Sequence, residues 1–302
     1  MAIDPSAEVR GRWAAGIAFL YWGLIPVYWK AFSGVGAGEV IAHRIIWSLV
    51  FAGGLVFLRG SATAVARVLH NRRETMFLAL ASVLLSINWL TFVWAVTHDR
   101  VAASSLGYFL CPLVSVALAL AFERERLSRR QWMAVAFGSG GVAWLFFVEP
   151  TTPLPALLIA FSWAGYGWCK RRVEIGPVAS LAAETLILAP FAFLWIGWLA
   201  WRGTASFSFE VSTVGLFASA GLVTALPLIL FAYAARRIPL SALGFLNYLV
   251  PTTSLLLAVF LYGEPFGTRE ALGFGLIWSG LIIYSLGLFR GREPAASPPA
   301  PR

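Results

Sequence analysis

The feature that most constrains this chain is a series of long apolar segments that contain no charged residue. A helix needs about 20 mainly apolar residues to cross the hydrocarbon core of a bilayer. A transmembrane β-barrel would show short segments that alternate between apolar and polar residues, and these segments do not alternate. The sequence therefore predicts an all-α polytopic membrane protein with ten transmembrane helices. The segments are residues 13–29, 45–58 (extended backward through His43 and Arg44), 75–97, 101–122, 131–148, 150–169, 185–201 (extended backward through Glu184), 211–235, 238–263 and 271–289.

The composition supports a membrane protein and argues against several other classes. Only 12% of the residues are charged, against about 25% in a soluble domain, and the mean hydropathy is +0.78. The net charge is +9, but the basic residues lie in short loops between apolar segments, so nucleic acid is not expected as a partner. Cys111 and Cys169 are isolated within apolar segments and have no metal-binding spacing, so no metal or cofactor is expected.

The distribution of Lys and Arg predicts the orientation of the helices. Positively charged residues concentrate in short loops on the cytoplasmic side of a membrane. With the N-terminus inside, most of the 23 Lys and Arg residues fall in inner loops and Arg44 lies within a span. The outer loops hold Lys30, Arg100, Arg202 and Arg269. We therefore expect a multi-pass protein of the inner membrane with both termini in the cytoplasm, residues 1–12 forming one tail and residues 290–302 a disordered one.

The two halves of the chain resemble each other at an offset of about 140 residues. Pro112 and Glu125 are 13 positions apart, as are Pro251 and Glu264. At an offset of 142, the matched pairs are Phe19 with Phe161, Tyr21 with Trp163, Gly23 with Gly165 and Lys30 with Arg172. This pattern predicts two five-helix repeats, residues 13–148 and 150–289. Because each repeat has an odd number of helices, the second is inverted, which is typical of secondary transporters with a substrate site between the repeats.

Several short motifs also point to one family. In the first half they are Tyr21-Trp22-Gly23, His43-Arg44-Ile45-Ile46-Trp47-Ser48, Asn88-Trp89, Trp94-Ala95-Val96, Ser105-Leu106-Gly107-Tyr108-Phe109 and Pro112-Leu113-Val114. In the second half they are Glu184-Thr185, Pro227-Leu228, Leu243-Gly244-Phe245 and Tyr262-Gly263-Glu264. Over nearly its whole length the chain resembles the drug/metabolite transporter superfamily, EamA-type, and is most similar to the RarD-type members. It departs from the family pattern at Arg124, where Gly usually precedes the glutamate.

This resemblance carries expectations about fold but few about chemistry. It implies ten helices in two inverted repeats. It also implies a central cavity lined mainly by the first to fourth and the sixth to ninth helices. It supplies neither a physiological substrate nor an agreed set of transport residues.

The strongest candidate site lies on the second helix. His43 and Trp47 are four residues apart and share one face, and Arg44 lies on the next. An ionisable group at membrane depth is costly and indicates a functional site. An imidazole, an indole and a guanidinium suit an aromatic or anionic substrate group, and His43 can also carry a coupling proton. The alternative is that Arg44 reaches outward toward Glu39 and the lipid headgroups.

Glu184 is the second candidate, because it stands at an offset of 141 from His43. A carboxylate in an apolar segment keeps its charge only where a partner stabilises it. We therefore expect Glu184 to pair with His43 or Arg44 between the two repeats. The alternative is a glutamate near the end of a helix, because Gly176 and Pro177 precede it by only a few residues.

Polar and aromatic side chains within the apolar segments complete the predicted substrate site. Asn88 and Asn247 need hydrogen-bond partners, so they either join helices or line the cavity. Lys30 and Arg172 end matching helices on opposite sides of the membrane, where they are gates or interfacial anchors. The aromatic candidates, which interfacial belts would also explain, are Trp22, Trp89, Tyr108, Trp163, Tyr166 and Tyr248. The residues expected to cap helices or tie loops are Glu125 and Glu264.

These features predict a secondary transporter that exports a small amphipathic metabolite or drug-like molecule by alternating access. The chain has no G-x-x-x-x-G-K-[ST] motif for ATP, so coupling to protons, other ions or exchange stays open, as do a monomer and a homodimer. An intramembrane enzyme is a competing class, but neither H-E-x-x-H nor G-x-S-x-G is present. A channel is a third class, and it would need a symmetric ring of filter groups.

Overall fold

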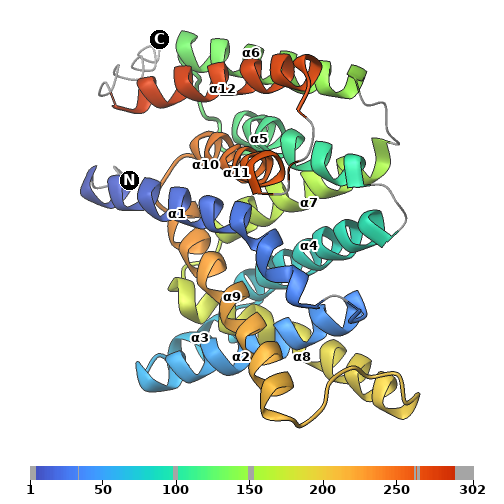
Figure 1. Cartoon of the computed structure of the whole chain (residues 1–302). Coiled ribbons are helices and arrows are strands. Elements are labelled where there is room, and N and C mark those ends of the chain that lie inside the picture. Colours follow the sequence, from blue (N-terminus) through green and yellow to red (C-terminus); the bar gives the residue numbers. More distant parts are fainter. Residues whose placement is uncertain are drawn as a thin grey trace, which may run out of the picture.

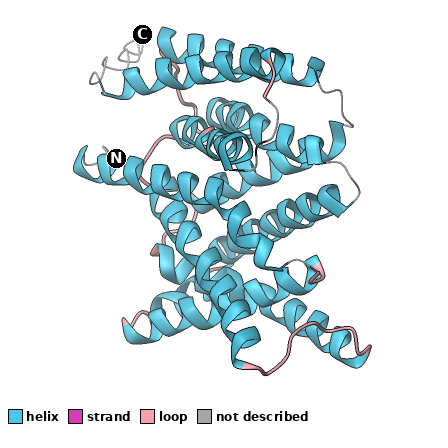
Figure 2. Cartoon of the chain, in the orientation of Figure 1, coloured by secondary structure: helices cyan, strands magenta, loops and turns pink. Residues whose placement is uncertain are grey.

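The computed structural model describes residues 5–32, 34–97, 101–148, 153–261, 263 and 266–289, and the regular structure in these residues is all helical (Figure 1; Figure 2). A short 3₁₀-helix, Lys30–Phe32, follows α1, and a π-helical segment, Leu257–Leu261, follows α11. The α-helices are α1 (Pro5–Trp29), α2 (Ala37–Leu58), α3 (Ala62–His70), α4 (Arg72–Thr97), α5 (Val101–Phe122), α6 (Arg129–Val148), α7 (Pro153–Lys170), α8 (Pro177–Trp201), α9 (Val211–Ala235), α10 (Leu240–Leu246), α11 (Leu249–Leu256) and α12 (Thr268–Phe289).

The all-helical prediction is confirmed, and each predicted apolar segment is helical over most of its described residues. Among the described residues, six helical stretches are long and apolar enough to cross a membrane. They are Ala37–Leu58, Arg72–Phe92, Arg129–Val148, Pro177–Trp201, Val211–Ala235 and Leu240–Leu261. A shorter apolar stretch, Leu106–Phe122, lies in α5. The protein is therefore a multi-pass membrane protein by length and composition of its helices.

The structure differs from the sequence prediction at three places. α1 already begins at Pro5, within the expected N-terminal tail, whereas the expected C-terminal tail lies outside the described residues. α3 is a nine-residue helix between the second and third predicted spans, too short to register as an apolar span. The ninth predicted span tightens between α10 and α11, where the amide of Asn247 donates to the carbonyl of Gly244 and that of Tyr248 to Phe245 while both residues keep right-handed helical dihedral angles. These are the i to i+3 bonds of a tight turn.

The two halves of the chain are interleaved. α2 packs against α8 and α9, α5 against α7 and α10, α6 against α12, and α1 against α9 and α11. In Figure 1, α6 and α12 form a pair at the upper end of the bundle, while α2, α3 and α8 lie at the lower end. The start of α1 and the end of α12 lie on the same side of the bundle (Figure 1). The core is therefore largely the interface between the first and the second half.

Glycines allow helices from the two halves to approach closely. A Cβ atom on Gly221 of α9 would lie 2.3 Å from the Cβ of Trp47 and 2.7 Å from the amide nitrogen of Ser48, both on α2. The Ser48 hydroxyl donates to the carbonyl of Gly221 at 3.0 Å. Small residues at helix crossings are a common feature of membrane proteins, because they let backbones pack directly.

The turn after α5 contains a backbone conformation that explains why the family usually has glycine at the position of Arg124. Arg124 has a φ of 53°, within the left-handed region that favours glycine. The family pattern usually has Gly at this place, and a glycine adopts this conformation without steric cost. The turn is closed by the amide of Glu125, which donates to the carbonyl of Ala119 at 3.1 Å.

Glu125 ties this turn to the start of α10, which confirms its expected role as a cap. Its Oε1 accepts from the amide of Leu240 at 2.7 Å, and its Oε2 accepts from the hydroxyl of Ser241 at 2.6 Å. The other expected cap, Glu264, lies outside the described residues. A carboxylate at a helix N-terminus satisfies free amides and interacts favourably with the helix dipole.

Glu125→Ala is therefore expected to lower the free energy of unfolding by about 1–2 kcal/mol. The measurement is equilibrium unfolding of the purified protein in mixed detergent micelles. Glu210→Ala is the matched control, because Glu210 is the N-cap of α9 but its side chain makes no capping bond. Equal effects of the two substitutions would show that Glu125 does not act as a cap.

Candidate functional site

A small pocket lies where α5, α7, α9 and α10 meet at the tight turn in the ninth span. Its walls are formed by one face of α7, the side chain of Phe231 and the residues around the turn. The lining residues are Ser115, Trp163, Ala164, Gly167, Phe231, Leu240, Leu243, Gly244 and Asn247. The free space between them is about that of one water molecule. The pocket is therefore closed to an organic molecule in this conformation.

Asn247 supplies the polar group with the least satisfied hydrogen bonding in this pocket. Its residue is 2% exposed, and its amide nitrogen makes no hydrogen bond to a nitrogen or oxygen atom in the described part of the chain, its one polar neighbour being the weakly accepting sulfur of Cys111 on α5. A buried amide donor without a strong partner costs free energy, so proteins rarely retain one without a reason. The sequence prediction placed Asn247 in the cavity, and the structure locates it in the wall of this pocket.

Aromatic rings extend from the pocket toward α1. The rings of Trp22 and Trp163 meet edge to face at 5.0 Å, and both contact Phe231. Tyr166 stacks on Phe231 with an interplanar angle of 16°. The structure therefore brings together Trp22, Trp163 and Tyr166, three of the predicted aromatic candidates, around one ring of α9.

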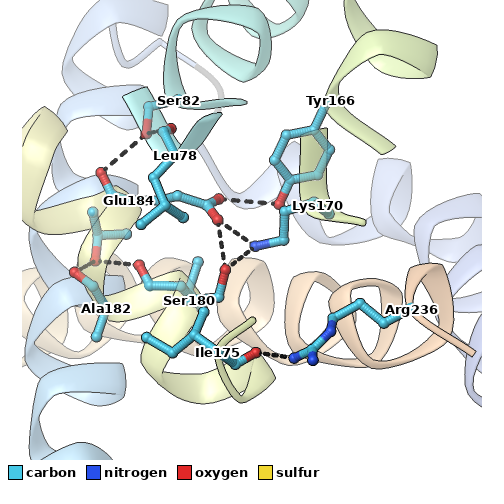
Figure 3. Close-up of polar contacts among 11 residues, drawn as sticks. Leu78, Ser82, Tyr166, Lys170, Ile175, Ser180, Ala182, Glu184 and Arg236 are labelled. Carbon is cyan, nitrogen blue, oxygen red and sulfur yellow. Dashed lines mark hydrogen bonds and ion pairs between the residues drawn. The ribbon is translucent and has the colours of Figure 1, made fainter. Parts of the chain in front are cut away.

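Tyr166 also contacts a buried ion pair between α7 and α8. Its hydroxyl donates to Oε2 of Glu184 at 3.2 Å, and the ammonium of Lys170 forms an ion pair with Oε1 (Figure 3). The side chains of Lys170 and Glu184 are 3% and 1% exposed. The hydroxyl of Ser180 lies 2.6 Å from the Lys170 nitrogen and 3.0 Å from Oε1 of Glu184. Every charged atom of this pair therefore has a close partner.

The expected pairing of Glu184 with His43 or Arg44 is wrong. Lys170 takes that place, and the sequence analysis missed it because an apolar segment ending at residue 169 made Lys170 a loop cation. The signal that could have found it is spacing: Lys170 lies one turn after Tyr166 on the same helix face, as does Glu184 after Ser180.

Arg44 lies in a different environment, between two indole rings. Its guanidinium carbon is 4.6 Å from the ring centre of Trp29 and 4.2 Å from that of Trp89. Its Nε donates to the hydroxyl of Thr224 on α9 at 2.8 Å. The alternative pairing with Glu39 does not occur, because the Glu39 carboxylate accepts hydrogen bonds from the amides of Ser206 and Phe207.

His43 and Trp47 face an aromatic cluster that also includes Trp29. The imidazole of His43 stacks on Phe207 at 4.7 Å and lies 4.3 Å from the ring of Phe217. Neither of its ring nitrogens has a hydrogen-bond partner among the described residues. Trp47 packs against the same cluster, and its indole nitrogen also has no partner there. Trp29, one of the two indoles beside Arg44, belongs to this cluster as well, so the three neighbours on α2 border the same aromatic cluster.

The remaining polar and aromatic candidates mainly join helices. The amide nitrogen of Asn88 donates to the carbonyl of Ile159 at 3.1 Å, and its oxygen accepts from the Tyr108 hydroxyl at 3.3 Å. Asn88 and Tyr108 thus link α4, α5 and α7. Tyr248 is fully buried outside the pocket, with its hydroxyl 3.0 Å from where a Cβ on Gly138 would lie.

The end of α7 forms ion pairs with the end of α5. Arg172 binds Oε1 of Glu123 at 2.8 Å, and its guanidinium lies 4.7 Å from the ring centre of Trp168. Its predicted counterpart Lys30 belongs to the short helix after α1, but its side chain lies outside the described residues. Arg172 is therefore a tie between helices of the two halves.

Two further arginines close the same face of the bundle. Arg171 donates to the carbonyls of Ala235 and Ile238, and Arg236 donates to that of Ile175 (Figure 3). Burial, together with the neighbouring Arg237, lowers the pKa of the Arg236 guanidinium from its ordinary value. The loops α7–α8 and α9–α10 are thus bound to each other through backbone carbonyls.

Interleaved apolar helices, a closed pocket between the halves and arginine contacts on one face define a polytopic membrane protein. Comparison of the sequence with known families identifies it further. The sequence model of the EamA-like transporter family matches residues 10–147 and again residues 152–286. The chain therefore belongs to the EamA-like transporter family, and the two matches confirm the repeated arrangement of the sequence.

Curated relatives of full length support this assignment. The chain is 39% identical to the uncharacterized transporter YojE of Bacillus subtilis, covering 95% of this chain and 97% of that protein. It is 34% identical to protein RarD of Escherichia coli, covering 93% and 96%. A solved crystal structure aligns with a TM-score of 0.71 over 95% of this chain at 20% identity, which shows the same fold. Membership of a transporter family confirms that the chain is not an enzyme.

Proposed function

We propose that this protein is a secondary transporter that exports a small amphipathic organic molecule across the inner membrane by alternating access. The observation that carries the proposal is the buried amide of Asn247, which lines a pocket formed by both halves of the chain and has only the sulfur of Cys111 as a weak partner. A substrate bound there would satisfy the amide and separate the helices that now close the pocket. Transporters of this type bind substrate near the midplane, often at a discontinuous helix.

Ten membrane spans in two inverted repeats, residues 13–148 and 150–289, form part of the proposal. The pairing of helices from opposite halves supports it, as do the start of α1 and the end of α12 on the same side of the bundle (Figure 1). An even number of spans places both ends on one side of the membrane. The Arg-rich loops of that side support a cytoplasmic location for both termini.

The closed arginine face supports a role for Arg172 as a gate residue. Its ion pair with Glu123, and the bonds from Arg171 and Arg236 to loop carbonyls, hold this face shut. Opening the pocket to this side requires these contacts to break. Lys30 at the matching position of the first repeat is proposed to act in the same way at the opposite mouth.

Counterflow across reconstituted vesicles tests the proposed function. Vesicles loaded with one member of a metabolite panel are expected to accumulate the labelled form of the same compound in a saturable manner. Parallel runs with and without a pH gradient test proton coupling. Uptake that rises linearly with concentration and shows no counterflow would identify a channel and overturn the proposal.

Asn247→Leu is expected to slow counterflow of the transported compound about tenfold. The leucine fills the pocket and removes the donor, so the substrate loses a hydrogen bond and its space. The thermal stability should stay equal or rise, because a weakly paired buried amide is replaced by an apolar group. Ser279→Ala on α12 is the control, because that hydroxyl bonds only within its own helix. A less stable variant with normal counterflow would show that Asn247 is structural.

A further inference from the structure

Two cations lie deep among the helices, and the structure treats them differently. Lys170 is paired with the carboxylate of Glu184. Arg44 lies in α2, and no carboxylate of a described residue comes within 4.0 Å of it. Glu39, the acidic residue that precedes it on α2, is already bound to the amides of Ser206 and Phe207. A cation at this depth without a counter-ion is costly, so an anion from outside the chain would be bound favourably.

The surroundings of Arg44 fix the orientation of its guanidinium. The indoles of Trp29 and Trp89 lie close to it, with ring centres 4.6 Å and 4.2 Å from its central carbon. The hydroxyl of Thr224 occupies Nε, and the two terminal nitrogens have no bond to a described residue. A guanidinium held in this way presents a planar pair of donors, which matches the two oxygens of a carboxylate.

The neighbourhood of Arg44 also suits an apolar body on the bound molecule. Arg44, Trp29 and Trp89 each keep part of their surface exposed. Indole faces bind flat apolar groups by stacking. The adjacent Asn88 bonds to Ile159 and Ser162 of α7, immediately before Trp163 in the pocket wall. Neighbouring residues of α4 therefore contact the guanidinium of Arg44 and the helix α7 that forms one wall of the pocket.

The internal repeat strengthens the contrast between the two cations. At an offset of 142, Lys170 corresponds to Tyr28, and at an offset of 141, Glu184 corresponds to His43. Tyr28 bonds to the hydroxyl of Ser219 at 2.6 Å. The second half thus supplies both members of an ion pair, whereas the equivalent positions of the first half supply no carboxylate for Arg44.

We propose that Arg44 recognises an anionic group of the substrate, and that the transporter carries organic carboxylates with a flat apolar body. Trp29 and Trp89 receive the body, and the guanidinium receives the carboxylate. This inference rests on the proposed function and names its substrate class. Arg44 is the residue that selects for charge.

The test compares two ligands of equal shape and different charge. Binding of indole-3-acetate and of indole-3-acetamide to the purified full chain is measured by isothermal titration calorimetry. The wild type is expected to bind the acetate at least tenfold more tightly. Arg44→Gln should remove this preference, whereas Arg44→Lys should retain part of it, because the charge remains without the planar fork. Arg202→Gln should leave the preference intact, since Arg202 lies over Trp198 at an exposed position.

Three results would overturn or separate the proposals. Equal affinity of the wild type for the two ligands, or an unchanged preference in Arg44→Gln, overturns the carboxylate site. Folding of Arg44→Gln is checked by a cooperative melting transition, because the substitution removes the contacts with Thr224 and the two indoles together with the charge. If the acetamide shows counterflow and the acetate is not preferred over it, the proposed transporter function is supported and the carboxylate site is excluded. If the acetate binds tightly in an Arg44-dependent manner but no compound shows counterflow, the carboxylate site is supported and the proposed transporter function is excluded.

Discussion

Removing either member of the Lys170–Glu184 pair is expected to lower the free energy of unfolding by about 3–5 kcal/mol. Both side chains are almost completely inaccessible, so the remaining charge would have no water to replace its partner. Glu184→Leu would leave the Lys170 ammonium with only the Ser180 hydroxyl. Lys170→Met would leave the Glu184 carboxylate with Ser180 and Tyr166.

The double variant Lys170→Met with Glu184→Leu should recover most of this loss, because apolar groups of similar volume often replace a buried ion pair without penalty. Equilibrium unfolding in mixed micelles measures all three variants. Glu8→Gln is the control, because the pair Glu8–Arg12 is partly exposed and such pairs contribute less than about 1 kcal/mol. Single variants as stable as the wild type would show that the pair is not a structural tie.

Gly221→Val is expected to destabilise the protein by about 3 kcal/mol or more, because the new side chain would collide with α2. The colliding atoms are largely backbone atoms of Trp47 and Ser48, at 2.5 Å and 2.7 Å from the added Cβ, and backbone cannot turn aside as a flexible side chain can. The hydrogen bond from Ser48 to the carbonyl of Gly221 would also be lost.

The same helix provides the matched control for this substitution. Gly215 of α9 has no atom within 4 Å of an added Cβ, so Gly215→Val should leave the stability within about 0.5 kcal/mol. Folded yield and melting temperature in detergent measure both variants. A Gly221→Val protein that melts like the Gly215→Val protein would show that α2 and α9 can separate freely at this crossing.

Most of the fold follows from the sequence because lipid leaves the backbone few options. Backbone groups in a hydrocarbon layer must bond within the chain, so each long apolar segment forms a helix. α3 was not predicted because a nine-residue amphipathic helix has no apolar run of spanning length. The tight turn at Asn247 was not predicted because the segment Leu240–Leu261 is apolar on average, despite Ser241, Thr252 and Ser254, and hydropathy carries no information about a turn in such a segment.

The site was less predictable, because a shared offset between the repeats identifies equivalent positions but does not show that the residues at these positions touch each other. Glu184 and His43 match between the repeats, and this led to a pairing that the structure does not contain. Glu184 binds Lys170 from the same half. Asn247 could be recognised as polar in an apolar segment, whereas its weakly paired amide follows only from the three-dimensional contacts.

The tight turn in the ninth span has a mechanical consequence. A continuous helix transmits torsion along its whole length, but the tight turn at Asn247 and Tyr248 interrupts the regular bonding that does so. On one side of the turn, α10 is fixed to the end of α5 through Glu125. On the other, α11 is attached to α1, where Ser254 bonds to the carbonyl of Gly23. The two parts of this span are therefore bound to different neighbours, and the pocket at Asn247 lies where they meet.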